Sequence, residues 1–116
     1  MTHKILQPTE WMRPKGYANG IAASGTQVFI AGQVGAALCN IVRVLEEAGG
    51  RPEHLVRLTW YVTSRREYLD EIQAVGAAYR AVMGGHFPAM SVVEVSALIE
   101  SEARVEIEAT AVVPAP

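Results

Sequence analysis

The sequence is poor in cysteine, and its lone thiol limits both the compartment and the chemistry open to the protein. Among 116 residues the single cysteine is Cys39, so no disulfide can form within the chain. A reducing compartment suits such a chain, and we expect a cytoplasmic location. Cys39 lacks a visible histidine partner, and its apolar helical surroundings predict a core residue rather than a nucleophile.

Long hydrophobic runs and an excess of positive charge are also missing. The first ten residues, MTHKILQPTE, lack the apolar run of a signal peptide, and no segment approaches the ~20 apolar residues of a membrane span. The net charge of -2 provides no positive field that would attract nucleic acid or an anionic membrane. We therefore expect neither a membrane nor a nucleic acid as a partner.

Residues that commonly bind metals or nucleotides do not occur at a useful spacing. His3, His54 and His86 fall in a terminus and two loops without ligand spacing, which disfavours a metal site. The glycines form neither GxGxxG nor GxxxxGK[ST], the two common phosphate-binding patterns. We expect neither a metal ion nor a cofactor.

What the sequence does contain is a regular succession of strand and helix patterns. Half of the residues are hydrophobic and 19% are charged, which predicts one globular domain over residues 1–116. Ser24-Gly25-Thr26 predicts a hairpin turn, and Ser64 with Glu67 has the spacing of a capping box. The periodicities predict strands at 3–7, 17–23 and 27–33, a helix at 36–48, a strand at 55–63, a helix at 64–83, and strands at 90–97 and 103–113.

This order predicts an α+β sandwich in which two helices cover one face of a mixed sheet. Tyr61, Glu106 and Glu108 then lie on the uncovered face, which is either exposed or packed against another copy of the chain. Inside such an interface the polar groups would need hydrogen-bonding partners. We favour a homo-oligomer, in which this face packs against another copy. Carboxylates two residues apart on a strand are usually solvated, and catalysis would require one of them to be recessed.

Six stretches of the chain resemble one known family. They are KGYANGI (15–21), FIAGQV (29–34), CNIVRVLEEAGG (39–50), VRLTWYVTS (56–64), HFPAMSVVEV (86–95) and VEIEATAV (105–112). In this order they are similar to the Rid family, also called the YjgF or UK114 family, over nearly the whole chain. The resemblance implies a chorismate-mutase-like α+β fold, and a homotrimer with its helices outside and three clefts between subunits.

The best-known members of that family hydrolyse reactive 2-imino or 2-enamino acids to 2-keto acids and ammonia. In them an arginine after Pro-Ala binds the substrate carboxylate, for which a bidentate guanidinium is well suited. A glutamate of the last strand helps to position the attacking water. By this resemblance Glu106 is the candidate catalytic residue, Tyr17 is a cleft tyrosine, and Gln33 completes the Gly-Gln pair.

Four positions of the implied cleft depart from the family pattern. Met90 stands in place of the arginine, Ala31 of a serine, Val92 of a cysteine and Gly76 of an asparagine. A thioether cannot replace a fixed positive charge, and the four changes together predict a less polar cleft. Simple 2-imino acids are therefore disfavoured as substrates, and Arg13 is the candidate for a different anion anchor.

Three kinds of function remain open. The first is hydrolytic deamination of another enamine or imine, as in the 2-aminomuconate deaminases of aromatic degradation. The second is a non-catalytic trimer that binds a small ligand or a protein partner, with Glu106 as a structural hydrogen-bond acceptor. The third is the endoribonuclease or translation-inhibitor activity attached to the family name, which the acidic balance of the chain disfavours.

The connection between the third predicted strand and the first helix is unusually short. In GQVGAALCNI the chain reverses within Val34 and Gly35, although connections between such elements commonly use ~2 to 6 residues and the helix is shortened as well. Family members usually have a loop at this point. We therefore expect residues to be missing between Gly35 and Ala36.

Overall fold

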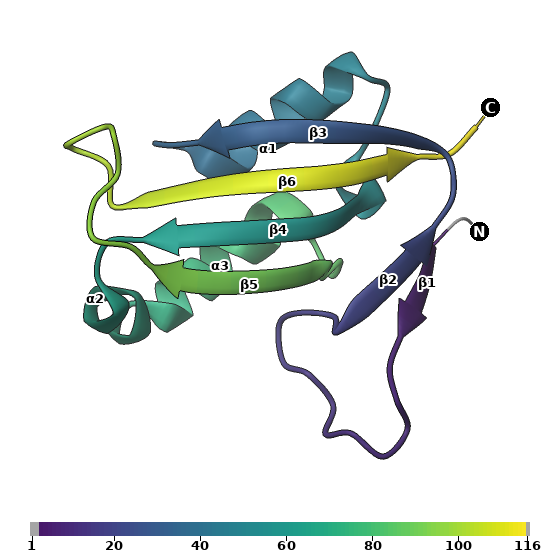
Figure 1. The fold of residues 1–116 in the computed structure, drawn as a ribbon, viewed down its shortest axis with the longest axis horizontal. Coiled ribbons are helices and arrows are strands. Elements are labelled where there is room, and N and C mark those ends of the chain that lie inside the picture. The colour runs from purple at the N-terminus through teal and green to yellow at the C-terminus, as the bar shows by residue number, and fades with distance from the viewer. Residues whose placement is uncertain (1–2, 116) are drawn as a thin grey trace.

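The computed structural model describes residues 3–115 and is built on a four-stranded mixed sheet. The strands lie in the order β3 (Thr26–Gln33), β6 (Val105–Val113), β4 (Leu55–Val62) and β5 (Ala89–Glu94). β6 pairs antiparallel with β3 and β4, and β5 runs parallel to β4. A parallel pair needs a long crossover, which α2 (Arg65–Asp70) and α3 (Ile72–Met83) supply (Figure 1).

Helices cover one face of this sheet and leave the other face open (Figure 1). α1 (Ala37–Glu47) and α3 bury residues four apart, which places them on one side of each helix: Ile41, Leu45, Tyr79 and Met83. Full burial of a side chain such as Ile41 stabilises the fold by about 1.5–3 kcal/mol. The sheet adds Ile30, Leu55, Leu58, Trp60, Ile107, Ala109 and Ala111 to the same core. The predicted α+β arrangement is therefore confirmed.

The N-terminal strands form a separate two-stranded sheet, so the hairpin predicted for the second and third strands is wrong. β1 (His3–Leu6) pairs antiparallel with β2 (Gly20–Ala23), while β3 joins β6. Gly25 turns the chain between the two sheets with a φ of 143°. A Cβ at Gly25 would lie 2.3 Å from the carbonyl oxygen of Val113, so the turn passes close against the end of β6.

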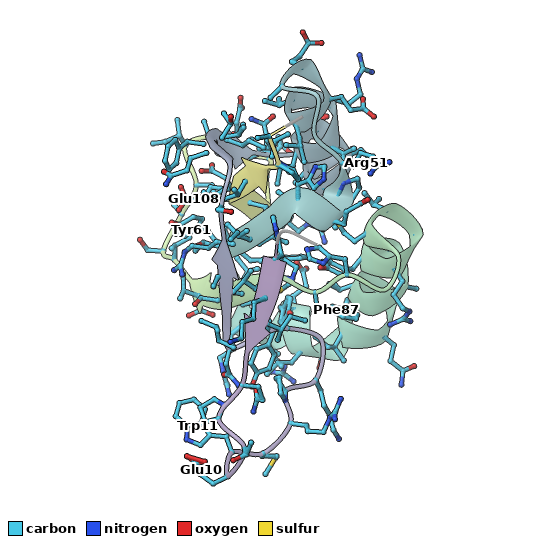
Figure 2. All side chains as sticks on the ribbon, turned by 90° about the vertical axis from the view of Figure 1, so that its right-hand side faces the viewer. Glu10, Trp11, Arg51, Tyr61, Phe87 and Glu108 are labelled. Atoms are coloured by element: carbon cyan, nitrogen blue, oxygen red, sulfur yellow. The ribbon has the colours of Figure 1, made fainter. Side chains whose placement is uncertain are left out.

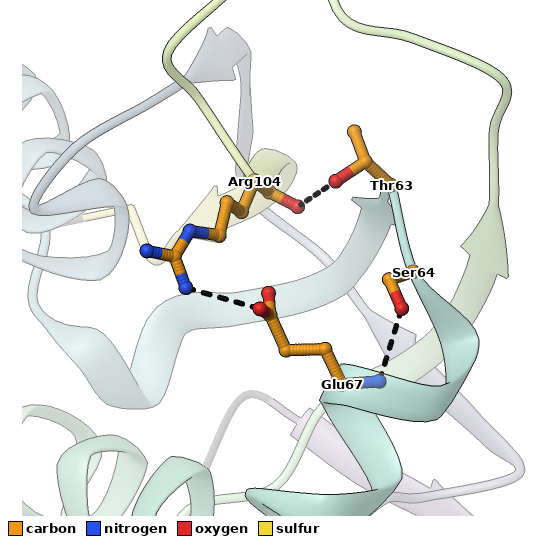
Figure 3. A network of polar contacts seen from close by, with 4 residues as sticks. All are labelled: Thr63, Ser64, Glu67 and Arg104. Atoms are coloured by element: carbon orange, nitrogen blue, oxygen red, sulfur yellow. Dashed lines mark hydrogen bonds and ion pairs between the residues drawn. The ribbon is translucent and has the colours of Figure 1, made fainter.

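The single helix predicted for residues 64–83 is two helices, which meet at Glu71. Glu71 has φ -102° and ψ 15°, outside the helical range. Half of the capping box is present, because Ser64 Oγ accepts the Glu67 N–H at 3.1 Å. The Glu67 carboxylate does not return to the start of the helix and pairs instead with Arg104 at 3.0 Å, which ties α2 to the residue before β6 (Figure 3).

Residues 34–36 close the short connection between β3 and α1. Gly35 has a φ of 72°, a left-handed conformation that glycine adopts without strain. Asn40 Nδ2 donates a hydrogen bond to the Val34 carbonyl oxygen at 3.0 Å and so holds the turn against the helix. That residues are missing between Gly35 and Ala36 stays a prediction, and the mass of the intact protein tests it.

Cys39 is exposed, so its expected place in the core is wrong. The buried residues of α1 are Ala37, Ile41 and Leu45, and a residue midway between Ala37 and Ile41 lies about half a helical turn away from them. None of the helices within residues 3–115 is long and apolar enough to span a membrane.

The three histidines, distant in sequence, gather around the short 3-10 helix η1 (Pro52–His54). The ring centroids of His3 and His54 are 6.3 Å apart. His3 Nε2 donates to the His54 carbonyl oxygen at 3.3 Å, and His86 Nε2 donates to the Leu55 carbonyl oxygen at 2.8 Å. Within residues 3–115 no group of three histidine, cysteine or acidic residues is arranged to hold a metal ion. These histidines fasten β1 and the start of β5 to η1.

Burial lowers the pKa of His54 from 6.5, an effect that Glu53 opposes and that Arg51, His3 and His86 reinforce. The folded protein then binds fewer protons at this site than the unfolded chain does. The free energy of unfolding therefore falls as the pH drops through the pKa that His54 has in the unfolded chain, and it stops falling below the pKa of His54 in the folded protein.

We expect the melting temperature to decrease between about pH 7.5 and about pH 5.5, and the decrease to be smaller in His54→Gln. Thermal denaturation followed by circular dichroism at each pH measures both slopes. Equal slopes in the two proteins would show that His54 does not contribute to the pH dependence.

Candidate functional site

The open face of the sheet carries the polar side chains of β6 and β4. Glu106 and Glu108 flank the buried Ile107, and they pair in register with Tyr61 and Thr59 of β4. Tyr61 donates a hydrogen bond to Glu108 Oε1. Figure 2 shows Tyr61 and Glu108 on the side of the sheet away from the helices. The shared face predicted for Tyr61, Glu106 and Glu108 is confirmed.

The two carboxylates of this face, Glu106 and Glu108, differ in whether they accept a hydrogen bond. The hydrogen bond to Glu108 raises the pKa of Tyr61, and burial and the charges of Glu108 and Glu106 act in the same direction. Tyr61 therefore stays protonated at neutral pH and keeps its hydrogen bond to Glu108. Within residues 3–115 the Glu106 carboxylate has neither a hydrogen bond nor an ion pair. Glu106 is thus the carboxylate that is available to a ligand.

Gly32 makes the space that the Glu106 side chain fills. A Cβ on Gly32 would lie 2.0 Å from Glu106 Oε2 and 2.6 Å from its carboxyl carbon. The register of β3 shifts between Ile30 and Gln33, so a bulge brings the Gly32 backbone against β6. Glu106 is half-buried as a result. The sequence contained a Gly-Gln pair, but only the register shows that Gly32 faces the carboxylate.

A broad hollow of about 410 Å³ lies beside these residues on the open face. Phe29, with 73% of its surface exposed, and Ala31 border it on β3. Arg57 and Thr59 border it on β4, and Glu108 forms part of its floor.

A second pocket lies on the helix side of the sheet. Met90 pairs in register with the buried Leu58, so its side chain points toward the helices and away from Glu106. We call this cavity of about 340 Å³ the α3 pocket; its lining residues are Lys15, Gly16, Trp60, Tyr68, Ile72, Val75, Gly76, Tyr79, Arg80, Phe87 and Met90.

Aromatic rings form the walls of the α3 pocket. Tyr79 and Phe87 stack with their ring centroids 5.2 Å apart and an interplanar angle of 8°. Tyr79 donates to the His86 carbonyl oxygen at 2.7 Å, which fixes its ring, and burial raises the pKa of Tyr79. Trp60 lies 6.4 Å from Tyr79, centroid to centroid. The charged residues of this pocket are Lys15 and Arg80.

The remaining predicted site residues lie around these two regions. Tyr17 is 41% exposed and precedes Ala18, whose N–H donates to the Pro88 carbonyl oxygen at 3.0 Å, next to the α3 pocket. Gln33 Nε2 donates to the Ala31 carbonyl oxygen at 3.1 Å at the end of β3. Val92 borders a separate hollow of about 160 Å³ with Val62 and Tyr68, on the helix side of β5.

Arg13 is exposed in the loop between β1 and β2, and it lines neither the α3 pocket nor the hollow on the open face. The structure therefore brings Met90 and Gly76 together in one pocket, and Ala31 and Glu106 together on the opposite face of the sheet. Sequence reasoning missed Arg80, Lys15, Tyr79 and Phe87 as site residues, because no motif marks residues that come together only in space, from α3, the β1–β2 loop and the loop before β5.

Known proteins share this architecture. The sequence model of the family described as endoribonuclease L-PSP matches residues 12–113. A crystal structure of YyfB from Yersinia pestis, a Rid-family protein of unknown function, is similar with 30% identity and a TM-score of 0.78, covering 97% of this chain and 100% of that chain. Rv2704 from Mycobacterium tuberculosis, of the YjgF/YER057c/UK114 family, has 34% identity and a TM-score of 0.66, covering 84% and 87%.

The YjgF gene product of E. coli is also similar, with 28% identity and a TM-score of 0.64, covering 83% of this chain and 87% of that chain. A comparison with curated proteins found no match. The fold is thus that of a small α+β protein with one open sheet face. The chain belongs to the Rid/YjgF/UK114 family, whose sequence model matches nearly its whole length.

The contact between Gly32 and Glu106 leads to a prediction about the open face. In Gly32→Ala the new Cβ must displace the Glu106 carboxylate, because the two would otherwise lie 2.0 Å apart. The carboxylate is the flexible end of a side chain, so we expect the melting temperature to change little while the carboxylate moves. A crystal structure of the variant measures the displacement.

Gly85→Ala is the matched control, because a Cβ on Gly85 meets no atom within 4 Å. Its Glu106 should keep the wild-type position. An unmoved Glu106 in Gly32→Ala would show that the glycine does not create this space.

Proposed function

We propose that this protein hydrolyses a reactive enamine or imine, releasing ammonia, at a site that Glu106 dominates. The observation that supports this most directly is the Glu106 carboxylate itself. It is half-buried over Gly32 and unengaged among residues 3–115, whereas Glu108 two residues away already accepts the Tyr61 hydroxyl. A recessed carboxylate with a free oxygen is what general base catalysis requires.

The chemistry needs few parts. The imine reacts as its N-protonated form: a water molecule attacks the carbon of the C=N bond while the Glu106 carboxylate accepts one of its protons, which leaves a neutral carbinolamine. The Glu106 carboxyl group then returns that proton to the nitrogen. The C–N bond breaks as the carbinolamine hydroxyl gives its proton back to the Glu106 carboxylate, so that the carbonyl forms, ammonia leaves, and the last proton passes from Glu106 to the departing ammonia. An enamine enters this sequence as its imine tautomer. Tyr61, held as a hydrogen-bond donor, keeps the neighbouring Glu108 from competing for the water.

The proposed site is completed by a second copy of the chain. Met90 and Gly76, which the family resemblance assigns to the substrate cleft, lie on the helix side of the sheet, and Glu106 lies on the open side. Residues on opposite faces of one sheet cannot line one cleft in a single chain. In the homotrimer implied by the resemblance the clefts lie between subunits, so the rim of the α3 pocket of one copy can meet the open face of the next.

The substrate is proposed to be larger than a simple 2-imino acid. Met90 offers a thioether where the resemblance implies an arginine, and the surrounding pocket is walled by Tyr79 and Phe87. An unsaturated substrate such as 2-aminomuconate suits these walls better than a short aliphatic one, since flat π systems stack on aromatic rings.

Glu106→Gln should lower ammonia release from freshly generated 2-aminomuconate by about 10²- to 10⁴-fold, because the amide cannot accept a proton. Glu108→Gln is the matched control on the same face and should retain most of the activity. Initial rates from a coupled ammonia assay measure both. Equal losses in the two variants would contradict the assignment of Glu106.

If the wild-type protein releases no ammonia from 2-aminomuconate or from a panel of 2-imino acids, the deaminase proposal fails and a binding trimer replaces it. Light scattering on every variant keeps a loss of assembly separate from a loss of chemistry.

Assembly through the open face is tested by Phe29→Asp. Phe29 is 73% exposed in the single chain, and a buried unpaired charge in an interface is strongly destabilising. We expect sedimentation of the wild-type protein at three times the 12.5 kDa chain mass, and sedimentation of Phe29→Asp as a single chain.

Ile99→Asp changes an equally apolar, fully exposed residue in the loop between β5 and β6 and should leave the trimer intact. A trimeric Phe29→Asp protein would show that the open face is not the interface.

A further inference from the structure

The exposed Arg80 lines the α3 pocket next to Gly76. The two residues are four apart on α3 and therefore share one side of the helix. A Cβ on Gly76 would lie 3.2 Å from Arg80 Nη1 and 3.9 Å from its guanidinium carbon. The guanidinium thus lies close over Gly76, and a side chain at position 76 would press against it.

Among the described residues, 3–115, this guanidinium has no acidic partner. The ion pairs within residues 3–115 join Arg51 to Glu53 and Arg104 to Glu67, and Arg80 takes part in neither. Lys15, the other cation of the pocket, is likewise in neither pair, and no aspartate or glutamate lines the α3 pocket. Two cations with no anion between them give the mouth of this pocket a positive potential.

The rest of the pocket is apolar and partly aromatic. Phe87 lies parallel to Tyr79, which is buried, and Met90 projects from β5 into the same space. A ligand that matches both parts is flat and unsaturated over most of its length and ends in a carboxylate. The planar guanidinium can bind both oxygens of that carboxylate, which a lysine or a histidine cannot do.

We propose that the α3 pocket binds an unsaturated or aromatic carboxylate, with Arg80 as its anion anchor, Lys15 as a second cation, and Phe87 and Met90 against its apolar body. Arg80 takes the role that the sequence suggested for Arg13. Its use as the substrate anchor in the deamination rests on the proposed function, whereas the binding itself does not.

The test uses trans-cinnamate and its neutral analogue trans-cinnamamide, which share one carbon skeleton and cannot be deaminated as imines. Isothermal titration calorimetry of the assembled protein should give one cinnamate site per chain, and cinnamamide should bind at least about tenfold more weakly. Arg80→Gln should weaken cinnamate by about 10- to 100-fold and leave cinnamamide unchanged, because only the charged ligand uses the guanidinium.

Three further variants isolate the geometry. Arg80→Lys keeps the charge without the planar fork and should lie between wild type and Arg80→Gln. Gly76→Ala should weaken cinnamate by less than Arg80→Gln does, because the new Cβ presses against the guanidinium and shifts it slightly. Arg66→Gln, an exposed arginine on α2 outside the pocket, is the matched control and should bind cinnamate as the wild type does.

The inference is overturned if cinnamate and cinnamamide bind equally, if neither binds, or if Arg13→Gln weakens cinnamate while Arg80→Gln does not. Melting curves of each variant identify a loss of fold. If Arg80→Gln does not fold, the cinnamate affinity of Arg80→Lys relative to the wild type tests the guanidinium instead. Cinnamate binding without any deaminase activity would support the pocket and refute only the proposed reaction.

Discussion

The alternation of β6 is the constraint on which the rest of the structure depends. Ile107, Ala109 and Ala111 point into the core beneath α1 and α3, and this burial leaves the intervening residues no choice but the opposite face. Glu106 and Glu108 therefore lie on the open side because their neighbours are apolar. A register slip of one residue would bury two carboxylates and expose the centre of the core, at a cost that no local interaction could offset.

Two glycines lie directly beside the charged side chains of the proposed site. Gly32, at the bulge of β3, lets the Glu106 side chain lie against the strand, and Gly76, in the middle of α3, lets the Arg80 guanidinium lie against the helix. Neither glycine has a positive φ, so backbone strain does not explain them. A glycine inside a helix costs about 0.5–1 kcal/mol relative to alanine. The space for a charged side chain is the benefit that the structure shows in each case.

Much of the fold could be predicted from periodicity, because β4, β6, α1 and α3 each alternate or repeat cleanly between core and solvent. The exceptions have local causes. The turn at Gly25 has the composition of a hairpin loop, yet β1 offers β2 a partner and β3 is needed beside β6. The break at Glu71 carries no glycine or proline, so nothing in the composition marks it. The closing of the chain through Gly35 depends on one positive φ that loop-length averages do not foresee.

Of the candidate site, only the position of the Glu106 carboxylate could be predicted from the sequence. Glu106 could be placed on the open face from alternation alone, but its difference from Glu108 depends on Tyr61, a partner from another strand. The proposed anion anchor was harder to predict, since Arg13 lies near the expected cleft residues in sequence, whereas Arg80 joins Met90 and Gly76 only in space. A proton acceptor on one face of the sheet and a cationic pocket on the other make each chain incomplete under the proposed function. Assembly then becomes a condition for catalysis, because only a neighbouring copy can bring the two halves to the same ligand.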